Sequence, residues 1–244
     1  MLNRILLYFF ILILNNSYAL ASPAPFDKCG DLPEWKTLPQ CNTLFDSSNA
    51  RIISGNVNSF DGQSVENPCL FLFDKKEGDV VCVHEGEKSG HFKFYASRQS
   101  FHSLATVRGY AINHLETWVK NLPKNEDLEL TLRIGRLEIY GTEVHFSDQK
   151  INISFIPWSL GRYLNGLPLN DITPLVTDDG IFVEFGSCQI DGIKIEGFDS
   201  ASGKYSVSGN VSKCENQTPK TIKIKVFSIE YNEWGESQYF CDWI

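Results

Sequence analysis

The sequence predicts a mostly β fold, either an antiparallel β-sandwich or an open barrel, with one amphipathic helix. Short segments in which apolar and polar residues alternate recur along the chain, as is typical of half-buried strands. Gly, Asn and Asp residues interrupt these segments about every 8–12 residues, as in sandwiches and barrels. With 42% hydrophobic and 13% aromatic residues, the 244-residue chain has enough apolar material for a core, so general disorder is excluded.

The first residues have the three parts of a secretory signal peptide. Arg4 supplies a positive charge, residues 5–14 form an unbroken apolar run, and Ala19-Leu20-Ala21 matches a cleavage site. An apolar run this short does not span a bilayer, because a spanning helix needs ~20 residues. We therefore predict that residues 1–21 are removed and that the protein is secreted to the extracellular space. A short signal anchor is the alternative.

The remaining chain is expected to contain a Cys-containing loop segment over residues 22–50 and a single β-rich extracellular domain over residues 51–244. Large β folds of this size are common as one domain. A net charge of −8 argues against nucleic acid and against anionic membrane surfaces as partners, since both attract basic patches. No second long apolar run follows, so we expect no membrane insertion.

Seven cysteines follow the predicted signal peptide, and in an oxidising compartment they are expected to pair. From proximity along the chain, we predict three disulfides: Cys29–Cys41, Cys69–Cys82 and Cys188–Cys214. An odd count leaves one cysteine over, and Cys241 is the candidate. If Cys241 bonds to a second chain, the protein is a disulfide-linked dimer.

Four segments are predicted as strands because apolar residues occupy every second position: residues 128–134, 151–155, 181–185 and 222–226. Asp191-Gly192 predicts a two-residue hairpin turn. After Val226 the apolar phase moves to Phe227, Ile229 and Tyr231, which predicts a β-bulge near Val226 and Phe227.

Residues 110–122 break the strand pattern and predict the one amphipathic helix. Apolar residues recur there at three- and four-residue intervals: Ala111, Leu115, Trp118, Val119 and Leu122. Glu116 and Lys120 lie four residues apart, and Pro123 ends the segment.

Three sequons predict N-glycosylation of the secreted protein at Asn152, Asn210 and Asn216. Asn152 alternates with the apolar residues of its predicted strand, so we expect it on the solvent-facing side.

No pattern typical of catalysis or metal binding is found, so we expect no catalytic residue, no metal ligand and no cofactor. The histidines lack ligand spacing, and neither a Gly-x-Ser-x-Gly nor a Cys-x-x-Cys sequence occurs. Asp178-Asp179 precedes Gly180 in what we interpret as a turn. A glycosidase needs two carboxyl groups ~5–10 Å apart, and a strand acid such as Glu184 has no second acid on its face.

Aromatic residues near the C-terminus are the strongest candidates for ligand binding. Four of them lie among Gly, Asn and Glu residues: Tyr231, Trp234, Tyr239 and Trp243. Aromatic side chains bind sugars and protein surfaces well because they combine a rigid apolar area with a polar edge. A role in the core is the alternative.

One stretch resembles a von Willebrand factor type D domain. Three parts of the chain are similar to the family's pattern: Ser59-Phe60-Asp61-Gly62, then Cys69-Leu70-Phe71-Leu72 with Cys82, and later the Asn165-Gly166 turn before residues 180–183. The family's Cys-Gly-Leu-Cys-Gly-Asn ending is absent. The resemblance implies an extracellular adhesion or matrix module without the family's calcium and multimerisation sites.

Together, these features predict a secreted, disulfide-bonded, glycosylated binding or adhesion module for a protein or carbohydrate ligand. Two alternatives remain open. A structural matrix component would be linked through the odd cysteine, and a secreted glycoside hydrolase would use a carboxylate pair.

Overall fold

The computed structural model describes residues 29–74, 79–99, 102–107, 115–147, 149–167, 171–186, 188–212 and 221–241. Several predicted features lie outside these residues: the signal peptide, the first part of the predicted helix, Cys214, Asn216 and Trp243. Among the described residues, no helix is both long and apolar enough to cross a membrane.

The described chain is built mainly of strands. In order, they are β1 (Ala50–Ser59), β2 (Cys69–Asp74), β3 (Val80–Glu85), β4 (His91–Ser97), β5 (His102–Val107), β6 (Thr117–Leu122), β7 (Leu128–Ile134), β8 (Leu137–Ser147), β9 (Lys150–Ser159), β10 (Ile181–Glu184), β11 (Gln189–Asp199), β12 (Lys204–Ser212), β13 (Thr221–Ser228) and β14 (Glu233–Phe240). The helical segments are short: η1 (Cys29–Asp31), η2 (Pro33–Lys36), α2 (Cys41–Leu44), α3 (Leu160–Leu164) and η4 (Asp178–Gly180).

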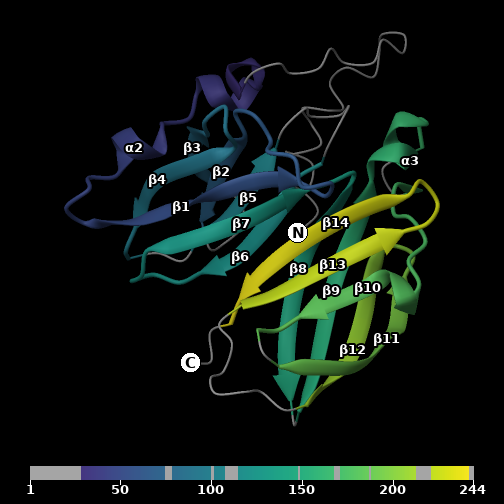
Figure 1. Ribbon diagram of the computed structural model, residues 1–244. Coiled ribbons are helices and arrows are strands. Elements are labelled where there is room, and N and C mark those ends of the chain that lie inside the picture. Colours follow the sequence, from purple (N-terminus) through teal and green to yellow (C-terminus); the bar gives the residue numbers. More distant parts are fainter. Residues whose placement is uncertain are drawn as a thin grey trace.

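The strands form two β-sandwiches that share one sheet. A seven-stranded sheet has the order β10-β13-β14-β6-β5-β2-β3, and sheets of order β4-β1-β7 and β11-β12-β9-β8 complete the molecule. The first small sheet packs with β2, β3, β5 and β6 around one core, and the second packs with β10 and β13 around another. Figure 1 shows the first sandwich at the upper left and the second at the lower right. The predicted mostly β sandwich is therefore confirmed.

Alternation in the sequence correctly identifies the strands that have one buried face. Along β7, inward residues are buried and the residues between them are exposed. β9 and β13 also alternate, but most of the residues between the buried ones are half-buried. Asn152 and Asn210 are exposed on β9 and β12, so these two of the three predicted glycosylation sites face solvent.

The predicted helix over residues 110–122 is wrong for its C-terminal part, which is strand β6. β6 lies inside the seven-stranded sheet between β5 and β14, and five of its six residues are buried. A strand covered on both faces carries apolar residues on both sides, so its sequence loses period-two alternation. For this reason, the apolar residues of β6 match helical spacing, namely Trp118, Val119 and Leu122.

Two of the three predicted disulfide pairings are wrong, although the cysteines themselves were correctly chosen. Cys29 bonds to Cys69 at the start of β2, and Cys41 bonds to Cys82 in β3. The segment that carries Cys29 and Cys41 lies against the seven-stranded sheet, so each cysteine meets a strand and not its neighbour in sequence. Cys188 is also disulfide-bonded. Its predicted partner lies outside the described residues.

The predicted hairpin at Asp191-Gly192 is also wrong. β11 continues through these residues as one strand, and its register against β12 shifts between Asp191 and Lys194. Gly192 adopts a φ of +63°, so the glycine serves a β-bulge and not a turn. A bulge twists a strand at the edge of a sheet, which hinders pairing with another chain.

Candidate ligand-binding face

The outer face of β10, β13 and β14 carries the strongest candidate for a ligand site. β13 pairs with β14 without a register shift, so the predicted β-bulge near Val226 and Phe227 is wrong. Unbroken alternation points Ile222, Ile224 and Val226 into the second core. Phe227 therefore lies on the opposite side of the sheet, outside the core.

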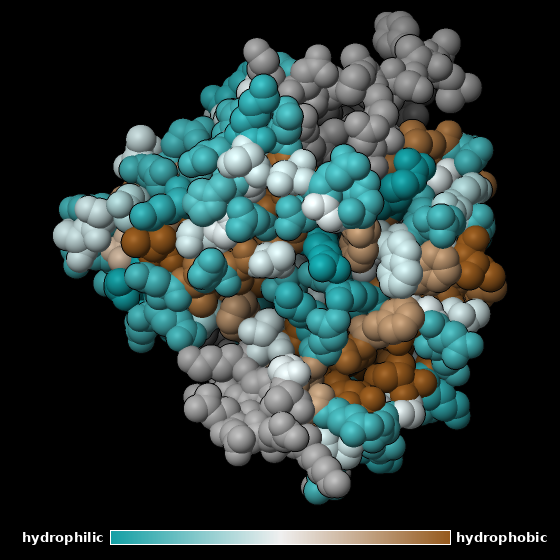
Figure 2. Space-filling view, in the orientation of Figure 1, coloured by the Kyte–Doolittle hydropathy of each residue, from teal (hydrophilic) through white to brown (hydrophobic). Residues whose placement is uncertain are grey.

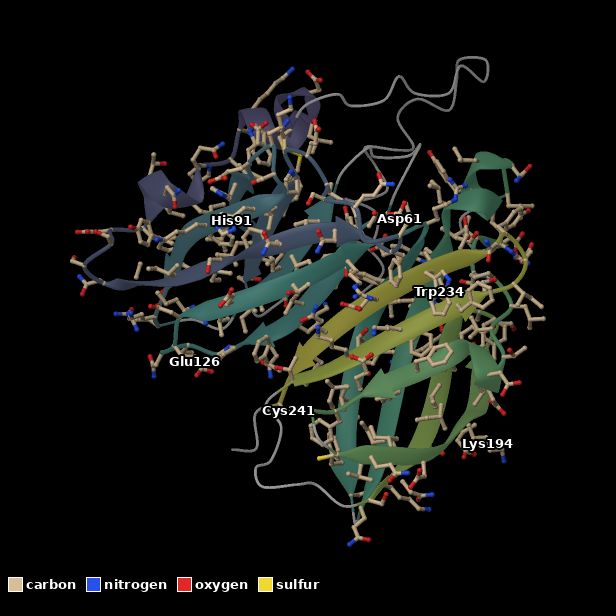
Figure 3. All side chains as sticks on the ribbon, viewed as in Figure 1. Asp61, His91, Glu126, Lys194, Trp234 and Cys241 are labelled. Atoms are coloured by element: carbon tan, nitrogen blue, oxygen red, sulfur yellow. A yellow bond between two sulfur atoms is a disulfide. The ribbon has the colours of Figure 1, made fainter. Side chains whose placement is uncertain are left out.

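Four aromatic side chains meet on this outer face, and we call them the aromatic face. The ring centroid of Trp234 lies 4.7 Å from that of Phe227, 5.7 Å from Phe182 and 6.0 Å from Phe60. Phe182 is 45% exposed, so part of its ring is accessible to solvent. Figure 3 shows Trp234 on the viewer's side of the β13–β14 hairpin, and Figure 2 shows hydrophobic residues gathered around this region.

The fold brings these rings together from distant parts of the sequence. Phe227 and Trp234 are directly opposite in the antiparallel pair of β13 and β14. Phe60 comes from the turn after β1 in the first sandwich. Gly135 permits its approach, because a Cβ there would lie 2.1 Å from the Trp234 carbonyl oxygen and 2.8 Å from the Phe60 ring. The aromatic face therefore lies at the junction of the two sandwiches.

Charged groups flank the rings in opposite-charge pairs. The Lys225 ammonium pairs with the Glu184 carboxylate across β13 and β10. Glu236 lies opposite Lys225 on β14 and is 2% exposed. Burial raises the pKa of Glu236, and the nearby Lys223 ammonium opposes that rise. The face thus offers hydrogen-bond donors and acceptors with little net charge.

The four aromatic residues predicted from the sequence lie in different parts of the protein. Trp234 is at the centre of the aromatic face, and Tyr231 is 37% exposed in the turn beyond it. Tyr239 instead packs against the second core. Trp243 lies outside the described residues. Sequence reasoning missed Phe60, Phe182 and Phe227, although the out-of-phase position of Phe227 was the available signal.

A buried carboxylate fixes the loop beside the aromatic face. Glu233, at the start of β14, accepts hydrogen bonds from the Ser159 hydroxyl at 2.5 Å and the Gly161 N–H at 2.7 Å. Burial raises its pKa, and these two bonds act in the opposite direction. Gly161 also lets the Tyr231 ring lie against α3, since a Cβ would come within 2.5 Å of the ring. These contacts hold the β13–β14 turn against α3.

A second buried acid lies where β6 meets β8. Glu138 is 5% exposed and accepts a hydrogen bond of 2.7 Å from the Trp118 indole N–H. The Lys120 ammonium is 4.9 Å from the centroid of the Trp118 ring and 5.7 Å from that of Tyr140. Burial raises the pKa of Glu138 to about 7, although Trp118 and Lys120 favour its charged form.

Glu138 is expected to make the protein less stable as the pH rises. The folded state keeps the Glu138 proton up to about pH 7, whereas the unfolded chain loses it near 4.5. Between these pH values the folded state binds more protons, so the free energy of unfolding falls as the pH increases. We expect Glu138→Gln to remove this fall, and therefore to be more stable relative to the parent at pH 8 than at pH 4.5. Urea denaturation of the parent and the variant at pH 4.5 and pH 8 measures this difference in the free energy of unfolding.

Glu143→Gln is the matched control for this experiment. The Lys204 ammonium lowers the pKa of Glu143, so this carboxylate stabilises the fold at high pH and loses that effect on acidification. The two variants should therefore differ from the parent in opposite directions as the pH changes. Parallel pH profiles for parent and Glu138→Gln would contradict the assignment.

The described residues contain no group of three or more His, Cys, Asp or Glu side chains that could hold a metal ion. Within the same residues, the buried acids face cations and hydrogen-bond donors. Glu138 faces Lys120 and Trp118, and Glu233 has the Arg136 guanidinium at 3.5 Å.

No family model and no curated protein matches the chain. Among solved structures, a DUF3823 family protein from Bacteroides ovatus has 11% sequence identity and a TM-score of 0.31, over 78% of this chain and 98% of that one. A proposed carbohydrate-binding protein from Bacteroides uniformis has 10% identity and a TM-score of 0.29, over 79% and 100%. BcpA, the major pilin subunit of Bacillus cereus, has 11% identity and a TM-score of 0.27, over 78% and 67%. At such TM-scores, these matches assign neither a family nor a ligand, and the resemblance to von Willebrand factor type D domains stays a prediction.

Proposed function

We propose that this protein is a secreted, disulfide-bonded binding module that recognises a carbohydrate on its aromatic face. The observation that carries the proposal is the gathering of Trp234, Phe227, Phe182 and Phe60 on the outer side of a sheet, away from both cores. Exposed apolar patches that are rimmed by polar residues often mark binding surfaces. The two disulfides with both cysteines described, together with Cys188, fit an oxidising extracellular compartment.

The polar surroundings favour a sugar over a strongly charged ligand. Lys225 and Glu184 form an ion pair beside the rings, so their charges offset each other. Both groups keep further donor or acceptor capacity for hydroxyl groups. The flat apolar faces of a pyranose ring can pack on aromatic side chains while its hydroxyl groups bond at the rim. A neutral or weakly charged glycan matches this combination.

The test is a glycan array followed by affinity measurements with a Trp234→Ala variant. Removing the central ring of a binding face costs ~2 kcal/mol or more, which is about a 30-fold loss of affinity. Isothermal titration calorimetry with the best glycan on the array measures this loss.

Trp158→Ala provides a matched control. Trp158 is also a half-buried tryptophan, but it stacks on Tyr140, with ring centroids 4.8 Å apart, outside the aromatic face. We expect this variant to bind the glycan like the parent. Equal loss of affinity in both variants, or an array without any bound glycan, would refute the proposed site.

A further inference from the structure

A second apolar surface lies at one end of the second sandwich, where α3 and the β13–β14 turn are adjacent (Figure 1). Large hydrophobic side chains are exposed there on several separate segments, and we call this surface the apolar end. Its members are Leu164 at 45%, Leu167 at 37%, Leu175 at 64%, Phe198 at 50%, Ile229 at 70% and Tyr231 at 37% exposure. Single exposed apolar residues are ordinary, but several gathered at one end indicate an interaction surface.

Hydrogen bonds and an ion pair hold the segments of the apolar end together. The Arg162 guanidinium of α3 pairs with Glu230 in the β13–β14 turn at 2.9 Å, and it donates to the Asp171 carbonyl at 2.7 Å. The Ser228 hydroxyl donates to the Leu175 carbonyl at 3.3 Å. The loop of residues 171–177 is therefore fixed to both α3 and the turn.

The end of β11 joins the same assembly through Tyr205. The Tyr205 hydroxyl donates to the Pro174 carbonyl at 3.0 Å and accepts from the Val176 N–H at 3.2 Å. The Phe198 ring packs on Tyr205, with centroids 4.6 Å apart. Because these contacts already fix the loops, binding of a partner would cost little conformational entropy for ordering them.

The charges around the apolar end are mainly negative. Exposed acids lie on the same segments, namely Asp171, Asp178, Asp179 and Asp199. The neighbouring cations Arg136 and Lys204 are paired with Glu233 and Glu143. The charge of Arg162 is already engaged by Glu230. A second copy of this chain or an anionic membrane would bring further negative charge to the rim and be repelled. A positively charged partner would be attracted.

We propose that the apolar end docks a basic segment of another protein, one that presents apolar anchor residues flanked by Lys or Arg. The anchors would cover Ile229, Leu175 and Phe198, and the basic residues would face the acidic rim. None of its six members is one of the four rings of the aromatic face, so the proposal does not depend on carbohydrate binding.

The test measures binding of a fluorescently labelled amphipathic peptide built from Leu and Lys, by fluorescence anisotropy. We expect saturable binding to the parent that weakens at high salt, because the rim charges are exposed. The double variant Ile229→Ser, Leu175→Ser should bind at least about ten-fold more weakly. Thermal unfolding followed by circular dichroism establishes that the double variant is folded.

Leu44→Ser is the matched control, because Leu44 is 45% exposed on α2 in the first sandwich. This variant should bind the peptide like the parent, and a peptide with Glu in place of every Lys should not bind. Three results would each overturn the proposal: equal weakening by Leu44→Ser, equal binding of the Glu peptide, or no binding of the Lys peptide. Phosphatidylserine vesicles that bind the parent but not the double variant would assign the surface to a membrane. Sedimentation showing a dimer that the double variant loses would assign it to a second copy.

Discussion

Replacing Cys82 with serine is expected to lower the free energy of unfolding by about 4 kcal/mol in the chain-entropy model. The Cys41–Cys82 bond joins residues separated by 41 positions, so it removes much freedom from the unfolded chain. Both cysteines are buried in the first core, where Cys82 is 0% and Cys41 is 1% exposed. Loss of the bond also leaves a polar hydroxyl in that core. Urea denaturation without reductant measures the change.

The pairing itself can be checked independently of stability. Proteolysis of the unreduced protein should release fragments that join Cys41 to Cys82 and Cys29 to Cys69. Cys241→Ser serves as the comparison, because Cys241 is only half-buried at the margin of the second core and its substitution should cost less. A Cys82→Ser protein as stable as its parent would show that this bond does not stabilise the fold.

Gly55→Ala is expected to prevent stable folding, with a loss of about 4 kcal/mol or more. Gly55 lies in the middle of β1, opposite Phe92 on one side and Leu130 on the other. Its φ is +154°, and a Cβ there would lie 1.9 Å from the Leu130 carbonyl oxygen. Only backbone movement can relieve this overlap, and it would separate β1 from β7. Soluble yield and thermal unfolding measure the effect.

Gly197→Ala is the control for that substitution. Gly197 also lies within a strand, the edge strand β11, but a Cβ there meets no atom within 4 Å. Alanine at this position should leave the stability unchanged or slightly higher, since it restricts the unfolded chain. A Gly55→Ala protein that unfolds within 1 °C of its parent would show that β1 and β7 do not pair as described.

The sequence predicts strands well where one face meets a core and the other meets solvent. Residues 128–134 and 222–226 alternate because β7 and β13 each bury one face. Prediction fails for β6, which lies between β5 and β14 and is buried on one face by the first core and on the other by the segment with Cys29 and Leu32. The neighbour β14 follows more than a hundred residues later, so no local pattern could reveal that position.

The candidate site was only partly predictable for a related reason. Trp234 was identified as an aromatic residue in a polar context, and it is the centre of the aromatic face. Phe227 was assigned to the inward phase because apolar residues usually point to a core. Phe60 reaches Trp234 only through the junction of the two sandwiches, which depends on long-range strand pairing. Sequence spacing carries no information about such contacts.

The sharing of one sheet by both sandwiches has a consequence for the order of folding. β6 pairs in parallel with β14, and the Thr117 hydroxyl donates to the Glu236 carbonyl across 119 positions of sequence. During synthesis the first sandwich therefore emerges before the strand that covers one edge of its sheet. An open strand edge readily pairs with other chains, so newly made protein is most prone to aggregate in this interval. The open edge of the first sandwich is covered against pairing with other chains only after β14 has been synthesised.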